Sequence, residues 1–269
     1  MSKIHLEEIL HEFKEYNLEF LYKMLETMNI SGMLTDPRVI EAMRNIRIED
    51  FITMDMIETF IDPEVKGTEK VTDELIRTIL LQLFAIFYNN RPLPFYNSPI
   101  YGRSTSAPHM IAIMAQLIEV ESGDNVLILG SKSGYLESIV QDMDEDITLY
   151  IIEKVKQIYD ITKSNIERID ATDKIKLYHM DPILDLTRLP LDEFDKIFIT
   201  GYMAEIPEIL KNAVKIGGLI CGPFGGKDQQ TLMRYFKLRQ HLFEEEEKGK
   251  VIFSPLITDY SKKEREKNE

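Results

Sequence analysis

Apolar side chains recur at helical spacing in the first third of the chain. Between residues 6 and 28 they return every three or four positions, which predicts an amphipathic helix. A second helix is expected after Asp36, a capping residue that Pro37 follows at the first helical position. A third helix is expected over residues 73–87. Proline, asparagine and glycine then crowd residues 89–102, which predicts a long ordered loop after the helices.

The pattern changes to short apolar runs separated by helical segments in the second half of the chain. We expect strands over residues 125–129, 147–152, 174–179, 196–200 and 219–224, and helices over 135–143, 154–168 and 207–215. Parallel strands need crossover connections, so this alternation predicts an α/β fold with a doubly wound, mostly parallel sheet. Residues 231–238 and 251–257 are expected to pair as antiparallel strands, with Lys248 and Gly249 in the turn between them.

These changes of pattern divide the chain into three regions. A helical N-terminal region is expected over residues 1–104, an α/β core over 105–226, and antiparallel strands with a charged tail over 227–269. No internal repeat interrupts this division.

Composition narrows the class of protein. The chain has 269 residues and a net charge of −14, which disfavours a broad electrostatic grip on nucleic acid. Its single cysteine, Cys221, excludes an intrachain disulfide and a paired-cysteine zinc site, and is expected to pack in the core rather than act as a nucleophile. The most apolar stretch, 75–88, is too short to span a bilayer, and the N-terminus lacks a signal peptide's apolar core. We therefore expect a cytoplasmic protein with neither nucleic acid nor membrane as its partner.

A turn that contains two glycines follows the first strand of the predicted sheet. Gly130 and Gly134 enclose Ser131 and Lys132 at the position where open α/β sheets bind ligands. Glu153 ends the next strand, roughly twenty residues later, where a carboxylate accepts hydrogen bonds from ribose hydroxyls. The alternative is a carboxylate that the N-terminus of the following helix stabilises.

A second carboxylate, Asp181, follows the third strand of this sheet. It could accept a hydrogen bond from the amino group of adenine, although an isolated aspartate here is more typical of a turn or cap. Glu153 and Asp181 end adjacent strands, so together they favour a ligand that contains adenosine.

Several segments occur in the order typical of one enzyme family. They are residues 36–52, 104–110, the glycine turn, Glu153, Asp181, and residues 193–200, 204–210, 214–226 and 251–257. In this order the chain resembles the protein-L-isoaspartate O-methyltransferases, over essentially all of residues 91–260. The resemblance implies a Rossmann-like methyltransferase sheet that binds S-adenosylmethionine. It also implies a repair enzyme that methylates the α-carboxylate of isoaspartyl residues in damaged proteins.

The resemblance also implies roles for individual residues. Ser106 matches the active-site serine, whose hydroxyl would orient the substrate carboxylate; the alternative is an N-cap for the helix that opens at Pro108. The residues that would bind or line the cofactor are Ser104, Thr105, His109, Gly130, Ser131, Gly134, Glu153, Asp181 and Thr258.

Three positions depart from the family pattern. Ile128 stands where the family has an acidic residue, and losing that carboxylate would weaken cofactor binding about tenfold to a hundredfold. Lys132 replaces the central glycine of the turn, where a β-carbon would crowd a ligand and a left-handed backbone would be strained. Its ammonium would repel a sulfonium, point outward, or meet the carboxylate of the methionine portion. Pro182 replaces the glycine after Asp181 and removes a backbone N–H.

Residues 54–88 exceed the length expected in the family and add an apolar helix. This helix is interpreted as an interface between copies of the chain, as a lid, or as an elaboration of the core. Two other functions also stay open. One is a non-catalytic relative that keeps the fold for binding or assembly, and the other is a tRNA methyltransferase, which the net charge of −14 disfavours.

Overall fold

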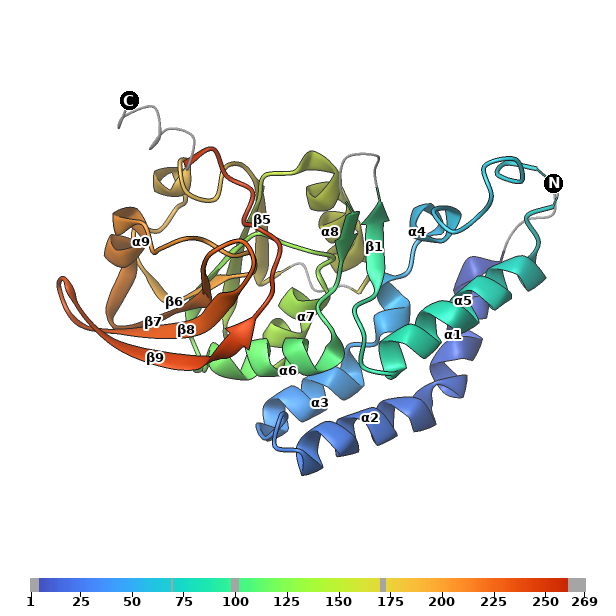
Figure 1. Cartoon of the computed structure of the whole chain (residues 1–269), viewed down its shortest axis with the longest axis horizontal. Helices are drawn as coiled ribbons and strands as arrows, with labels where there is room; N and C mark the ends of the chain where they lie inside the picture. The colour runs from blue at the N-terminus through green and yellow to red at the C-terminus, as the bar shows by residue number, and fades with distance from the viewer. Residues whose placement is uncertain (1–4, 69, 98–101, 170–172, 261–269) are drawn as a thin grey trace. The chain divides into compact units, whose positions relative to one another are not determined.

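The computed structural model (Figure 1) describes residues 5–68, 70–97, 102–169 and 173–260. Its contacts divide the chain into two compact units. The helical unit comprises residues 1–116 and 132–142, and the sheet unit comprises residues 117–131 and 143–269. The chain therefore passes from the sheet unit to the helical unit inside the glycine turn, between Ser131 and Lys132. The three regions expected from the sequence pattern are a different division, and they stay a prediction.

The helical unit consists mainly of helices. Its elements are α1 (Leu6–Tyr16), α2 (Leu18–Ile30), α3 (Pro37–Asn45), η1 (Ile48–Phe51), α4 (Met54–Glu58), α5 (Asp73–Tyr88), β1 (Pro94–Asn97), β2 (Gly102–Ser104), α6 (Pro108–Leu117), which ends at the unit's boundary, and α7 (Tyr135–Asp142). The helix expected over 6–28 is two helices that meet at Asn17, whose buried side chain donates to Glu49 Oε1 at 2.8 Å. The predicted cap is confirmed, because Asp36 Oδ1 accepts the Arg38 N–H at 2.8 Å and Pro37 opens α3.

Two further expectations for this unit have different outcomes. The helix predicted over 73–87 is confirmed as α5. The loop predicted over 89–102 is wrong in part, because β1 and β2 pair there as antiparallel strands; residues 98–101 lie outside the described residues. The four residues of β1 are too few for their alternation to be distinguished from a loop in the sequence.

The sheet unit contains a seven-stranded mixed sheet. Its elements are β3 (Asn125–Leu129), β4 (Thr148–Glu153), α8 (Lys156–Arg168), β5 (Ile175–His179), η2 (Leu186–Arg188), β6 (Phe194–Ile199), α9 (Glu208–Ala213), β7 (Val214–Gly225), β8 (Gln230–Arg239) and β9 (Leu242–Val251). The strand order is β5-β4-β3-β6-β7-β8-β9. The five strands from β5 to β7 are parallel, and β8 and β9 add antiparallel pairs, drawn in orange and red in Figure 1. The predicted fold class is confirmed, and the strand order reverses at β3, where ligands bind in such sheets.

The C-terminal hairpin differs from the expectation. β8 pairs with β9, which contains the acidic stretch 244–247, and the chain turns at Gln240 and His241, where His241 has a φ of 65°. The turn expected at Lys248–Gly249 and the strand expected over 251–257 are therefore wrong. β9 is an edge strand whose side chains are mostly exposed, so its glutamates remain solvated. The sequence therefore lacks the apolar alternation from which a strand would be predicted here.

One helix is also shorter than expected. α9 ends at Ala213, because β7 begins at Val214 and continues through Gly217 and Gly218. A β-carbon on Gly218 would lie 2.6 Å from the Asp195 carbonyl oxygen, so the glycine reflects close strand packing rather than the end of a helix.

The core of the sheet unit lies on both faces of its parallel strands. Leu127 and Leu129 point to one face of β3 and Val126 and Ile128 to the other, and all four are fully buried, as expected for a strand that is covered on both faces. Cys221 is also buried, and burial raises the pKa of its thiol to about 12, so its predicted packing role is confirmed. Within the described ranges, no helix is long and apolar enough to cross a membrane.

Candidate active site

The first half of the glycine turn closes tightly on the sheet unit. Gly130 has a φ of 81°, and its N–H donates to the Ile152 carbonyl oxygen at 2.8 Å. A β-carbon at this position would lie 2.8 Å from Thr200 Oγ1, whose hydroxyl donates to the Gly130 carbonyl oxygen. Both the backbone angle and the close contact require glycine here.

Glu153 is joined directly to this turn. Its buried carboxylate accepts the Ser131 N–H at Oε2 (2.8 Å) and the Val155 N–H at Oε1 (2.6 Å). Val155 directly precedes α8, so the bond to its N–H agrees with the helix-N-terminus interpretation of Glu153, which stays a prediction beside the ribose role. The ribose contact of Glu153 stays a prediction. The arrangement holds an acidic side chain beside the turn at the carboxyl end of β4.

Asp181 holds the C-terminal segment in place. Its Oδ1 accepts hydrogen bonds from the Thr258 hydroxyl (2.7 Å) and from the N–H groups of Ile183 and Leu184 (both 3.0 Å). Its Oδ2 accepts the Lys154 ammonium at 2.9 Å and the Asp259 N–H at 2.8 Å. The cap interpretation of Asp181 is therefore confirmed, and its adenine contact stays a prediction. The structure brings Thr258 directly to Asp181, and a cofactor contact of Thr258 stays a prediction.

Burial alone would raise the pKa of the Asp181 carboxyl, but its hydrogen bonds oppose this. The Leu184 and Asp259 N–H groups, the Lys154 ammonium and the Thr258 hydroxyl outweigh the burial and hold the pKa well below its usual range. The group is therefore charged at neutral pH.

The sequence pattern does not identify Lys154 as part of this site. The Lys154 ammonium also pairs with Asp259 Oδ2 at 2.5 Å. Burial alone would lower the pKa of Lys154, but its bonds to Asp259 and Asp181 outweigh burial and raise the pKa. A signal was present, since Lys154 follows Glu153 at the end of β4 and β5 lies alongside in parallel register. A cation directly after β4, such as Lys154, is therefore expected to lie near the residues that follow β5, which include Asp181.

Within the helical unit, the segment before α6 carries the predicted serine. Thr105 is tied to Leu93 by two bonds, from its N–H to the Leu93 carbonyl oxygen (2.8 Å) and from the Leu93 N–H to its hydroxyl (3.0 Å). Ser106 follows and is 8% exposed. α6 opens at Pro108 as expected, which places Ala107 at the N-cap position, so the N-cap interpretation of Ser106 is wrong. Ser104 ends β2 and is half-buried.

The Ser106 hydroxyl instead contacts the lysine of the glycine turn. Lys132 Nζ donates to Ser106 Oγ at 3.0 Å, and both residues belong to the helical unit. Lys132 is not among the residues with positive φ, so the strain expected from a left-handed backbone is absent at this position. The positive angles fall on the two glycines, and Gly134, with a φ of 85°, accepts the first backbone bond of α7, from the Ser138 N–H at 2.9 Å.

His109 lies in the first turn of α6 and contacts Asn90. The Asn90 Oδ1 accepts the His109 N–H at 2.8 Å and lies 2.9 Å from Nδ1 of the imidazole. Asn90 therefore caps the helix from a distant position in the chain, and burial lowers the pKa of the His109 ring. These contacts agree with a supporting role for His109.

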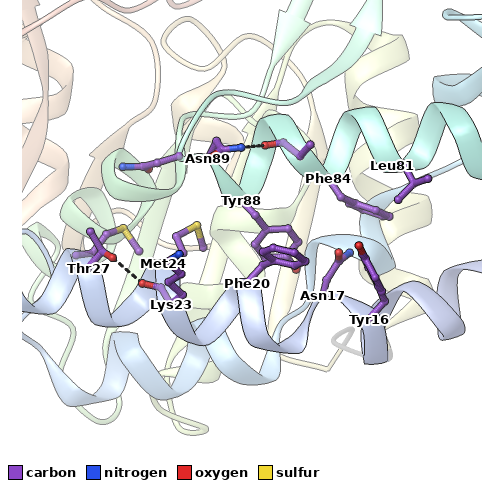
Figure 2. Close-up of a pocket in the computed structure, with 13 residues that line it drawn as sticks. Tyr16, Asn17, Phe20, Lys23, Met24, Thr27, Leu81, Phe84, Tyr88 and Asn89 are labelled. Atoms are coloured by element: carbon purple, nitrogen blue, oxygen red, sulfur yellow. Dashed lines mark hydrogen bonds between the residues drawn. The ribbon is translucent and has the colours of Figure 1, made fainter.

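A groove lies elsewhere in the helical unit, between α2 and α5. It has a volume of about 470 Å³, and Figure 2 shows Tyr16 and Phe20 on one wall facing Leu81, Phe84 and Tyr88 on the other. α5 buries six apolar residues in this unit, so the core-packing interpretation of the inserted segment is confirmed. Its interpretation as an interface between copies or as a lid stays a prediction.

Comparisons with known proteins agree with this architecture. The family model described as protein-L-isoaspartate(D-aspartate) O-methyltransferase matches residues 53–261. A protein-L-isoaspartate O-methyltransferase of Methanococcoides burtonii is 28% identical over 238 residues, which cover 88% of this chain and 99% of the relative. That of Pyrobaculum neutrophilum is 32% identical over 170 residues, which cover 63% of this chain and 79% of the relative.

Two solved structures share the fold. A Plasmodium falciparum structure named for the same family, in complex with S-adenosyl-L-homocysteine, has a TM-score of 0.62 and 21% identity, over 87% of this chain and 97% of that one. A second structure, named protein-L-isoaspartate O-methyltransferase, has a TM-score of 0.70 and 19% identity, over 91% of this chain and 69% of that one.

Proposed function

Because the chain belongs to the protein-L-isoaspartate(D-aspartate) O-methyltransferase family, we propose that it uses S-adenosylmethionine to methylate the α-carboxylate of isoaspartyl residues in damaged proteins. The observation that carries the proposal is the 2.8 Å bond from the Ser131 N–H to Glu153. It joins a glycine turn and an acidic side chain at the strand-order reversal, which is the arrangement that binds adenosine ligands in such sheets. The S-adenosyl-L-homocysteine in the Plasmodium structure supports the same class of cofactor.

Several of the predicted residues suit the cofactor in charge and in hydrogen-bonding capacity. Glu153 would accept bonds from the ribose hydroxyls, and the turn of Gly130, Ser131 and Gly134 would hold the methionine portion. Asp181 would receive the adenine amino group if one of its present donors moves aside. By the same resemblance, contacts with the donor are proposed for Ser104, Thr105 and His109 in the helical unit and for Thr258 in the sheet unit, each taken within its own unit. S-adenosylmethionine supplies an electrophilic methyl group on a sulfonium.

The protein's own part in the reaction is orientation. The Ser106 hydroxyl would donate a hydrogen bond to the substrate carboxylate and so align this carboxylate as the nucleophile. A carboxylate needs no base to become nucleophilic, so alignment and removal of water account for most of the rate. The burial of Ser106 supports such a role.

Calorimetric titration with S-adenosylmethionine and S-adenosylhomocysteine tests the cofactor. Micromolar binding by the wild type, lost in Glu153→Ala but kept in the exposed control Glu167→Ala, is expected; the control removes a carboxylate from the surface of the neighbouring helix α8. Methyl transfer to an isoaspartyl peptide, with none to its aspartyl isomer, then tests the substrate.

A folded wild type that binds neither ligand at millimolar concentration would contradict the proposal. The non-catalytic binding or assembly function would then be the better account. Methyl transfer to both peptides alike would keep the enzyme and reject the isoaspartyl substrate.

A further inference from the structure

Lys132 departs from the family's glycine and contacts the predicted substrate-binding serine. Its Nζ lies 3.0 Å from Ser106 Oγ, and Ser106 is only 8% exposed. Ser131 and Lys132 are consecutive, so one short turn carries a backbone donor to Glu153 within the sheet unit and a side-chain donor to Ser106 within the helical unit.

The direction of this hydrogen bond determines which donors Ser106 and Lys132 can offer to a ligand. An ammonium has donors and no acceptor, so the Ser106 oxygen accepts and its own hydroxyl hydrogen points elsewhere. A hydroxyl donor and a positive charge at hydrogen-bond distance are a match for a carboxylate, whose bonds to charged donors are the strong ones. A neutral or cationic group has no comparable interaction with the pair.

We propose that Ser106 and Lys132 form a two-point carboxylate site that binds the substrate's α-carboxylate. This inference rests on the proposed function, which supplies the substrate. The methionine portion of the cofactor also carries a carboxylate, which could bind the same site. We assign the site to the substrate's carboxylate because Ser106 matches the serine that orients the substrate in the family.

The charge on Lys132 affects binding and reaction differently. Methylation turns the carboxylate into a neutral ester, so the negative charge decreases on the way to the transition state. The ammonium therefore stabilises the bound substrate more than the transition state, which lowers KM without raising kcat. It also favours release of the ester over the acid. Lys132 is thus a specificity and positioning residue for an anionic substrate.

Paired peptides test the site by binding alone. An isoaspartyl peptide and its α-carboxamide analogue are titrated, with S-adenosylhomocysteine present, into the wild type, Lys132→Met and Lys132→Arg. Lys132→Met should weaken the carboxylate peptide about tenfold to a hundredfold and the carboxamide less than about twofold. Lys132→Arg keeps the charge and should stay within about threefold of the wild type.

The control removes a lysine elsewhere. Lys163 is exposed on α8 and pairs with Glu167 at 3.8 Å, so Lys163→Met should bind both peptides as the wild type does. In turnover assays Lys132→Met should raise KM by the same factor as the binding constant and leave kcat unchanged or higher. Lys132→Gly, which restores the family's residue, should behave like Lys132→Met and gives a second variant if methionine impairs folding.

The outcomes separate the sources and the hypotheses. If Lys132→Met weakens S-adenosylhomocysteine and leaves the peptide unchanged, the carboxylate site serves the cofactor. If Lys132→Met weakens the binding of both peptides equally, the carboxylate site is wrong. It is also wrong if Lys132→Met changes the affinity for neither peptide nor for S-adenosylhomocysteine. Both results would leave the proposed function of the wild-type enzyme intact. A wild type that binds neither peptide nor S-adenosylhomocysteine would overturn the proposed function as well.

Discussion

Replacing Asp181 by asparagine tests the clamp that holds the C-terminal segment in the sheet unit. The amide keeps one acceptor oxygen, but its NH2 group takes the position of an oxygen that now accepts from Lys154 or from the Thr258–Asp259 segment. Donors would then face donors in a largely buried place. We expect the free energy of unfolding at pH 7 to fall by about 2–4 kcal/mol.

The same substitution should change how stability depends on pH. Burial favours a raised pKa for Asp181, but its hydrogen bonds, from the Leu184 N–H first, hold the pKa below the unfolded value of about 3.9. A carboxyl with a depressed pKa in the folded state stabilises fully above its unfolded pKa, and that stability is lost as the pH falls through the folded pKa. The wild type should therefore lose about 1.3 kcal/mol of its advantage over Asp181→Asn between pH 7 and pH 3.

Urea unfolding followed by circular dichroism at several pH values measures this difference. The control is Asp160→Asn, which breaks an exposed pair with Lys156 on α8 (2.6 Å) and should cost less than about 1 kcal/mol. Equal losses in the two variants would refute the clamp. A difference between wild type and Asp181→Asn that stays constant from pH 7 to pH 3 would refute the pKa argument.

Three further variants or reactions test local features. Gly130→Ala should destabilise by about 1–3 kcal/mol more than Gly217→Ala, because both glycines have positive φ but only the first would place a β-carbon 2.8 Å from Thr200 Oγ1; equal melting temperatures would contradict this. Asn90→Gly keeps a backbone with positive φ and removes the cap of α6, so urea unfolding should show a loss of about 1 kcal/mol, and no loss would reject the cap. Cys221 should resist iodoacetamide at pH 8 in the native protein and react in urea, since burial raises its pKa to about 12; rapid native labelling would contradict its burial.

The fold is predictable from the sequence wherever burial is complete. The sequence predicts β3 to the residue, because every position from Val126 to Leu129 is buried and the apolar run has no gap. It fails at β9, where the strand is an exposed edge and four successive glutamates carry no apolar signal. Edge strands are defined by their partner, here β8, and a partner is not visible in a local pattern.

The residues of the candidate site also differ in how far the sequence predicts them. Gly130 and Glu153 can be selected from the sequence because ligands in open parallel sheets bind beyond the carboxyl ends of the strands, and their ligand contacts stay a prediction. The Ser106–Lys132 contact and the bond from Lys154 to Asp181 join residues 26 and 27 positions apart in the sequence. Such contacts depend on tertiary packing, which residue type and spacing alone do not determine.

The three departures from the family pattern differ in their consequences once their surroundings are known. Ile128 lies on β3, which pairs with β4 and β6, and its side chain is fully buried, so it belongs to the core. Pro182 stands in a turn whose next two N–H groups bind Asp181, so the missing donor leaves that turn intact. Lys132 adds a charge, and that charge is directed at Ser106. Of the three departures, Lys132 is therefore the one that adds a charge beside a predicted site residue, and the carboxylate site proposed for it stays a prediction.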